Sequence, residues 1–275
     1  MVQCGYKVYF CIVLFFFNAR CYAKTYFVSA ATSGFGVAIA HELAKHGNGL
    51  ILAARDEIKL NLIKREIESL YGVVCRTAIF DYKDKQSIQH LSPLFEQETL
   101  DGAVIIPARF TTLSTSSLLR SHEWQEMLDV GFIAPMHMIE MLLPALRKGS
   151  SLVVINGVTS VCYIPEYKNL NVLRKMWIAQ IKNLVYQLGD CDIRVNAVSP
   201  GVILTDYHMR NIKKRAAAAK RDMQQQLAWE AREVPLGRHG SPQDLAHAVT
   251  YLLSDGAAHI NGVNLLVDGG LSKAY

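Results

Sequence analysis

The feature that most constrains this chain is a regular alternation of short apolar runs with segments whose apolar residues recur at helical spacing. Strands that alternate with helices form parallel βαβ crossovers, and the helices then cover both faces of one sheet. The pattern therefore predicts one doubly wound α/β domain whose cleft lies at the carboxyl ends of its strands. We expect strands at 25–31, 49–54, 73–80, 102–106, 151–155, 193–198 and 263–267, and helices at 37–46, 58–70, 86–97, 124–147, 170–188 and 242–254.

Length and composition agree with this organisation. The chain has 275 residues, of which 51% are hydrophobic, and no linker, repeat or low-complexity segment interrupts the pattern. Such a composition excludes a disordered chain, a collagen-like repeat and a coiled coil. The formal net charge of +5 is a mild excess that is not gathered into one tract, so we expect no nucleic-acid partner.

Residues 1–23 differ from the rest of the chain. Lys7 precedes an unbroken apolar run at 8–17, and the small residues Cys21 and Ala23 stand at −3 and −1 of a potential cleavage site. This is the layout of a secretory signal, and the apolar run is short for a bilayer span, which needs about 20 residues. Three interpretations are open: an exported chain, a short membrane anchor, or a hydrophobic strand or over-extended start on an otherwise cytoplasmic protein.

The first expected strand runs into a turn that contains glycine and opens a helix. Glycine lets the backbone approach a pyrophosphate, and the start of a helix offers unpaired N–H groups and a positive dipole. We therefore expect this turn to bind the phosphates of a dinucleotide. The residues assigned to this role are Ser29, Ser33, Gly34, Phe35 and Gly36.

Two later stretches carry a family resemblance. Residues 193–201 read Ile-Arg-Val-Asn-Ala-Val-Ser-Pro-Gly, with Thr205 four residues on, and residues 267–270 read Val-Asp-Gly-Gly. With the turn, these motifs resemble the short-chain dehydrogenases/reductases over 24–271. The resemblance implies a Rossmann-like dinucleotide-binding domain at 24–275 that forms a homodimer or homotetramer. It also implies a substrate lid around 206–233 and cofactor contacts from Pro200, Gly201 and Thr205.

The end of the second expected strand bears on the choice of cofactor. Arg55 stands there, and a guanidinium can bind a 2′-phosphate through two hydrogen bonds, whereas a carboxylate would favour the free ribose of NAD. The resemblance implies that Arg55 selects NADP(H) over NAD(H) and that Asp81 contacts the adenine. The alternatives are a solvated Arg55 beside Asp56 and an Asx turn at Asp81.

The family's catalytic Asn, Ser, Tyr and Lys are all replaced. Counting without gaps from fixed motifs places Gly131, Gly157, Leu170 and Arg174 at these positions, and Ala30 at the first glycine of the turn. In the family, the tyrosine exchanges a proton with the carbonyl or alcohol while hydride moves to or from nicotinamide. Because the changes fall in the site and spare the scaffold, they indicate altered or lost chemistry.

One spacing opposes loss of chemistry. Tyr167 precedes Arg174 by seven residues, which is similar to the Tyr-x6-Lys of the enoyl-acyl-carrier-protein reductase branch. The resemblance implies that Tyr167 and Arg174 form a displaced proton-relay pair, although arginine is not equivalent to lysine. Tyr163 is a weaker candidate for the phenol, and Tyr167 as an ordinary loop aromatic is the alternative.

Three hypotheses follow. The first is an NADP(H)-dependent oxidoreductase that acts on a small carbonyl, alcohol or enoyl substrate. If the substrate is linked to an anionic carrier, the basic segment 210–221 would bind that carrier. That segment is otherwise a solvated helix face. The second is a catalytically inactive member with a binding or assembly role, and the third is cofactor-independent chemistry as in halohydrin dehalogenases.

Overall fold

The computed structural model describes residues 23–108 and 119–273. The leader predicted at 1–23, apart from Ala23, lies outside these residues. Seven parallel strands form one sheet in the order β3-β2-β1-β4-β5-β6-β7. The predicted seven-stranded parallel sheet is therefore confirmed. The strands are β1 (Thr25–Val28), β2 (Gly49–Ala54), β3 (Cys75–Ile79), β4 (Leu100–Ile105), β5 (Leu146–Ile155), β6 (Arg194–Pro200) and β7 (Asn264–Val267).

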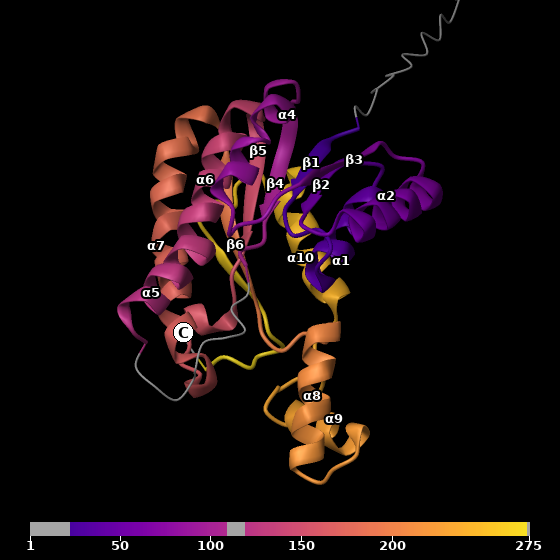
Figure 1. The fold of residues 1–275 in the computed structure, drawn as a ribbon, viewed down its shortest axis with the longest axis vertical. Coiled ribbons are helices and arrows are strands. Elements are labelled where there is room, and N and C mark those ends of the chain that lie inside the picture. Colours follow the sequence, from indigo (N-terminus) through magenta and orange to yellow (C-terminus); the bar gives the residue numbers. More distant parts are fainter. Residues whose placement is uncertain (1–22, 109–118, 274–275) are drawn as a thin grey trace, which may run out of the picture.

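Helices cover both faces of the sheet (Figure 1). One face packs against α1 (Gly34–Lys45), α2 (Glu57–Tyr71) and α10 (Pro242–Leu253). The opposite face packs against α3 (Lys85–Gln89), α4 (Ser92–Glu96), α6 (Ala134–Leu142) and α7 (Lys168–Leu188). Each apolar strand is thus buried on two sides, as a doubly wound domain requires.

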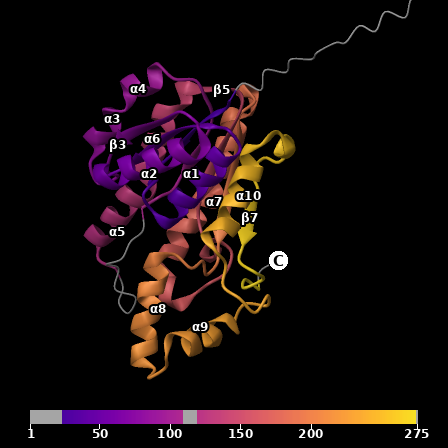
Figure 2. The ribbon, with the colours of Figure 1, turned by 90° about the vertical axis from the view of Figure 1, so that its right-hand side faces the viewer.

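The strand order places the candidate site. The winding reverses between β1 and β4, and such a switch point opens a crevice at the carboxyl ends of the strands. Two further helices, α8 (Asp206–Ala218) and α9 (Met223–Ala231), follow β6 and project beyond that edge (Figures 1 and 2). They occupy the region where the sequence predicts a lid.

Several predicted helices are divided. The expected helix at 124–147 consists of α5 (Ser121–Leu128), a π-helical turn (Asp129–Ile133), α6 and a 3-10 turn (Leu143–Ala145). The rest of the expected helix already belongs to β5. Likewise, the helix expected at 86–97 is split into α3 and α4. The apolar pattern continues across these breaks, so it does not reveal them.

Burial shows which apolar side chains of the helices face the core. In α2, Leu60, Ile63 and Ile67 face the core, whereas Ile58 and Leu70 are exposed, although they share the helical spacing. Within the described residues, the helical run Ser121–Ala145 has the length and hydropathy of a membrane span. Its inward side chains, such as those of α6, are buried against the sheet, so it serves as a core helix here.

Candidate active site

The turn between β1 and α1 has the close backbone packing expected of a phosphate cradle. The Ser33 side chain caps α1 by accepting a 3.0 Å hydrogen bond from the backbone N–H of Gly36. A Cβ on Gly36 would collide with the Ala30 carbonyl and lie 2.6 Å from the Cα of Ala31, so only glycine fits there. Ala30 has φ +47°, a left-handed conformation that favours glycine. The turn keeps its glycine-like shape although Ala30 replaces the first glycine.

Thr205 lies directly against this turn. A Cβ on Gly34 would be 3.0 Å from both the Cβ and the Cγ2 of Thr205, which is the N-cap residue of α8. Gly201, after Pro200 at the end of β6, approaches the backbone of Asp268 so closely that a Cβ would lie 2.9 Å from the Asp268 Cα. The fold therefore places Gly34, Gly201 and Thr205 at the carboxyl edge of the sheet, and their contacts with a cofactor stay a prediction.

Ser29 and Phe35 support the turn from inside. The fully buried Ser29 hydroxyl accepts hydrogen bonds from the Ile106 backbone N–H at 2.7 Å and from the Tyr82 phenol at 3.0 Å. Burial holds the pKa of the Tyr82 phenol well above its usual range, so it stays a proton donor. The Phe35 ring packs in the core with α1. These two side chains hold the floor of the turn and do not face the crevice.

Arg55 and Asp81 meet at the carboxyl ends of β2 and β3. Nη1 of Arg55 lies 3.5 Å from Oδ2 of Asp81, and the Arg55 side chain is 71% exposed. Asp56 caps α2 by accepting from the Lys59 N–H, so Arg55 pairs with Asp81 rather than with Asp56. The other Asp81 oxygen accepts from the Lys83 N–H at 3.0 Å, which forms the alternative Asx turn. The Asp81 carboxylate therefore pairs with Arg55 and also forms the Asx turn, while its contact with adenine stays a prediction.

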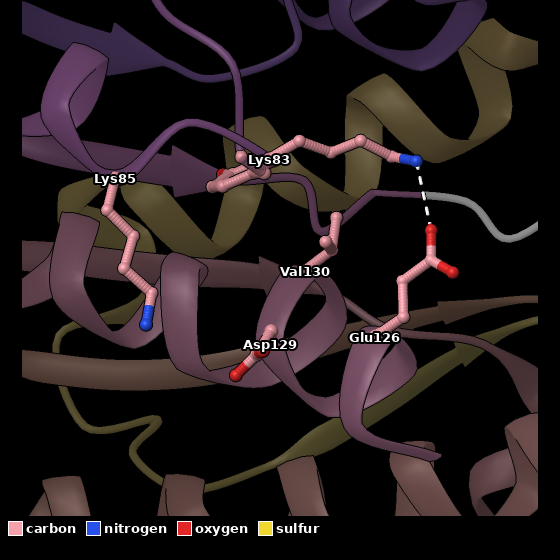
Figure 3. A pocket seen from close by; sticks show the side chains of 6 residues that line it. Lys83, Lys85, Glu126, Asp129 and Val130 are labelled. Carbon is pink, nitrogen blue, oxygen red and sulfur yellow. Dashed lines mark hydrogen bonds and ion pairs between the residues drawn. The ribbon is translucent and has the colours of Figure 1, made fainter. Parts of the chain in front are cut away.

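A cavity of about 370 Å³ adjoins Asp81. It lies between the loop after β3 and the end of α5, and the Lys83 ammonium bridges it by a 3.0 Å ion pair with Glu126 (Figure 3). None of the residues predicted to bind cofactor lines it. The lining residues are Tyr82, Lys83, Lys85, Glu126, Asp129 and Val130.

Gly157 and Arg174, both changed from the family pattern, are complementary in space. The Arg174 guanidinium occupies the volume that a side chain on Gly157 would fill. The backbone beside them is tied in place, because Asn156 donates a 3.1 Å hydrogen bond to the Arg174 carbonyl and the Gly157 N–H donates to Ser199 Oγ at 3.2 Å. A serine at position 157 would displace the guanidinium.

The other two changed positions supply no polar side chain. Leu170 packs against Leu119, Met127 and Leu173. Gly131 lies in the π-helical turn, and its carbonyl accepts a 2.9 Å hydrogen bond from the buried indole N–H of Trp177. Trp177 was not among the site residues predicted from the sequence, although it follows Arg174 by three residues on the same expected helix.

Tyr167 faces the α8–α9 hairpin. It is the N-cap residue of α7 and is 43% exposed, while Tyr163 is 68% exposed. Seven residues make two helical turns, about 10.5 Å, so Tyr167 and Arg174 share one side of α7. Two 2.8 Å hydrogen bonds to Glu230 raise the pKa of the Arg215 guanidinium on α8, and the nearby Tyr167 phenol adds to this effect.

Comparisons with known proteins agree with this geometry. The family model described as Enoyl-(Acyl carrier protein) reductase matches residues 29–272. Dehydrogenase/reductase SDR family member 4 of Rattus norvegicus is 26% identical over 255 residues, covering 90% of this chain and 86% of that protein. The 3-oxoacyl-(acyl-carrier-protein) reductase FabG of Rickettsia conorii is 27% identical over 254 residues, covering 90% of this chain and 96% of that protein.

Solved structures share the fold at lower identity. L-sorbose reductase from Gluconobacter frateurii, complexed with NADPH and L-sorbose, aligns with a TM-score of 0.83 at 24% identity, covering 92% of this chain and 98% of that one. An NADPH-bound short chain oxidoreductase from Pseudomonas aeruginosa PAO1, described as containing an atypical catalytic center, aligns with a TM-score of 0.82 at 23% identity, with the same coverage. Given the family match over nearly all of the described domain, the chain belongs to the short-chain dehydrogenase/reductase superfamily of oxidoreductases.

Proposed function

We propose that the chain is an NADP(H)-dependent oxidoreductase that interconverts a carbonyl compound and its alcohol. The observation that carries the proposal is the pairing of Arg55 with Asp81 beside an intact phosphate turn. NADPH in the complexes of L-sorbose reductase and the Pseudomonas oxidoreductase, and the reductase names of the relatives, support it.

The donor set fits NADP(H). The backbone at Gly34 and Gly36 and the start of α1 would hold the pyrophosphate, with Thr205 beside them. The exposed guanidinium of Arg55 would leave Asp81 for the 2′-phosphate, a stronger and bidentate partner. When bound, NADPH supplies the hydride for reduction.

Tyr167 is the proposed proton donor to the substrate oxygen. Its phenol is partly exposed on the side of α7 that also carries Arg174. The fixed positive charges of Arg174 and of Arg215 on α8 would stabilise the phenolate left after transfer.

The substrate is proposed to be a small molecule, with a carrier-linked form favoured by the hairpin. A cavity of about 350 Å³ on α9 is lined by Arg221, Gln225, Ala228, Trp229 and Arg232. The Arg221 guanidinium lies 4.6 Å above the Trp229 ring. Cations beside an exposed aromatic ring suit an anionic carrier group. A homodimer or homotetramer, and export or membrane association through residues 1–23, stay proposals as well.

Fluorescence titration with NADPH and NADH, followed by a turnover panel of ketones, 3-oxoacyl and enoyl thioesters, tests the proposal. We expect NADPH to bind more tightly than NADH and a carbonyl substrate to be reduced. Tyr167→Phe should lower kcat at least about 10-fold, whereas Tyr163→Phe, a matched change on the more exposed tyrosine, should not. Absence of NADPH binding would overturn the proposal. Binding without turnover, unchanged by Tyr167→Phe, would instead support the catalytically inactive alternative.

A further inference from the structure

We propose that Arg174 takes over the place of the missing side chain at Gly157 and binds the substrate oxygen directly through its guanidinium. This inference rests on the proposed function, because it assigns the group that stabilises the oxygen when the carbonyl is reduced. Arg174 would thus contact the reacting atoms instead of acting only through a tyrosine.

Geometry places the guanidinium at the correct edge of the sheet. Gly157 lies two residues beyond the carboxyl end of β5, in the crevice where ligands of doubly wound domains bind. The Arg174 guanidinium fills the volume next to the Cα of Gly157. The Asn156 amide at the Arg174 carbonyl and the Trp177 indole one turn later fix this part of α7. The cation is therefore positioned by its surroundings before any ligand arrives.

Unsatisfied polar atoms on residues close in the chain to Gly157 and Arg174 indicate that a polar ligand belongs near the end of β5. Within the described part of the chain, Asn156 Oδ1, Thr159 Oγ1 and both amide atoms of Asn171 are buried without a hydrogen-bond partner. All three residues lie within three positions of Gly157 or Arg174, and each is at most 9% exposed. A buried polar group without a partner costs about 1–3 kcal/mol, so several in one place call for a bound polar group.

The neighbouring polar cluster provides a contrast. Ser199 donates to Asn264 Oδ1 at 2.6 Å, and Asn264 donates to Ser160 Oγ at 3.1 Å. These side chains, from β6, β7 and the 3-10 turn Val158–Ser160 after β5, satisfy one another. Hydrogen-bonding capacity is therefore open at Asn156, Thr159 and Asn171 and not in this second cluster.

The chemistry follows from the charge of the guanidinium. When hydride adds to the carbonyl carbon, the π electrons of the C=O bond move to the oxygen, which becomes an alkoxide. A guanidinium donates charge-assisted hydrogen bonds to that oxygen and keeps its own protons, because arginine does not titrate in proteins. The proton that completes the alcohol comes from Tyr167, which regains one from water.

A double-mutant cycle at positions 157 and 174 tests the inference. Gly157→Ser should displace the guanidinium and lower kcat/KM by about 10-fold or more, as expected for loss of one charged donor. Arg174→Lys should lower it similarly, because it leaves the space empty. The double variant Gly157→Ser/Arg174→Lys should be more active than the product of the two single effects predicts, since the hydroxyl then fits beside the shorter cation. NADPH Kd should change less than about 2-fold throughout, which separates oxygen binding from cofactor binding.

A second measurement tests, without turnover, whether the Arg174 guanidinium occupies the space beside Gly157. Urea unfolding should show that Gly157→Ser destabilises the parent more than it destabilises the Arg174→Lys background. Gly189→Ser, at the end of α7 where a Cβ would meet nothing, serves as the control for adding a side chain. An active parent with unchanged kcat/KM in Gly157→Ser, or strictly additive effects, would overturn the inference alone. An inactive parent would overturn the proposed function and the inference with it.

Discussion

The indole N–H of Trp177 on α7 donates a 2.9 Å hydrogen bond to the backbone carbonyl of Gly131 in the π-helical turn. A π-helical turn interrupts the regular helical bonding, and such interruptions are frequent at functional sites. Trp177 is 1% exposed and its ring packs 5.0 Å from that of Phe132. The bond therefore joins two segments that carry changed catalytic positions.

Removing this bond should destabilise the domain. Trp177→Phe keeps an aromatic ring but leaves the Gly131 carbonyl buried without its donor, which should lower the free energy of unfolding by about 1–3 kcal/mol. Urea unfolding followed by circular dichroism measures it. Trp229→Phe, on the exposed lid surface, is the control and should cost less than about 1 kcal/mol. Equal effects of the two changes would contradict the structural role of Trp177.

The phosphate turn should not accept a methyl group at Gly36. Gly36→Ala forces a Cβ against the backbone of Ala30 and Ala31, so we expect weaker NADPH binding and a loss of about 1–3 kcal/mol of stability. Gly189→Ala adds the same methyl group where no atom lies within 4 Å, and its effect should stay within about 0.5 kcal/mol. Fluorescence titration and thermal unfolding measure both, and wild-type behaviour of Gly36→Ala would refute the assigned turn geometry.

Ala30→Gly should stabilise the chain. The left-handed φ of +47° costs an alanine about 1–2 kcal/mol, of which about 0.4–1 kcal/mol is offset because glycine loses more entropy on folding. We expect a net gain of up to about 1.6 kcal/mol in urea unfolding. Ala31→Gly should have the opposite sign, because Ala31 is fully buried in the core and has no positive φ. A loss of stability in Ala30→Gly would show that the turn adapts to alanine without strain.

Arg55→Gln should change cofactor preference more than cofactor binding in general. Loss of a charge-assisted contact to the 2′-phosphate should raise the NADPH Kd about 10-fold or more and leave the NADH Kd nearly unchanged. The NADPH effect should shrink as salt rises, because Arg55 is exposed. Arg65→Gln, an exposed change on α2, controls for net charge. Equal weakening of both cofactors would assign Arg55 a structural role.

The start of α10 should give a pH-dependent contribution to stability. The hydrogen bond from the Ser241 backbone N–H, with further ones from the Ser241 hydroxyl and Arg238, lowers the pKa of the Asp244 carboxyl from 3.8 to about 2. A lowered pKa in the folded state adds stability above pH 4 or so, and this stability is lost as pH falls toward about 2. Asp244→Asn should therefore be less stable than the parent at pH 6, by under about 1 kcal/mol given its partial exposure. The difference should narrow by pH 3, and a constant difference would exclude this cause.

The sequence predicts those features that a local pattern or a fixed spacing encodes. The parallel sheet follows from the alternation of strands and helices. The family motifs single out Gly34 and Thr205 as cofactor contacts, but only the structure shows that the two residues touch. The contact of Arg174 with Gly157 was not foreseen, because it depends on how a helix packs beside the end of a strand. The break at 129–133 was missed as well, since its residues continue the apolar pattern of a regular helix.

The strand order also has an evolutionary consequence. The phosphate turn, Arg55 and Asp81 belong to the β1–β3 half, and Thr205 reaches the turn from the segment after β6. Positions 131, 157, 170 and 174 all belong to segments after β4. Within the sheet the two halves meet at the pairing of β1 with β4, and outside it α1 packs with α10 in one core. Selection can therefore change the reacting positions after β4 while the phosphate turn, Arg55 and Asp81 before it continue to recognise the same cofactor.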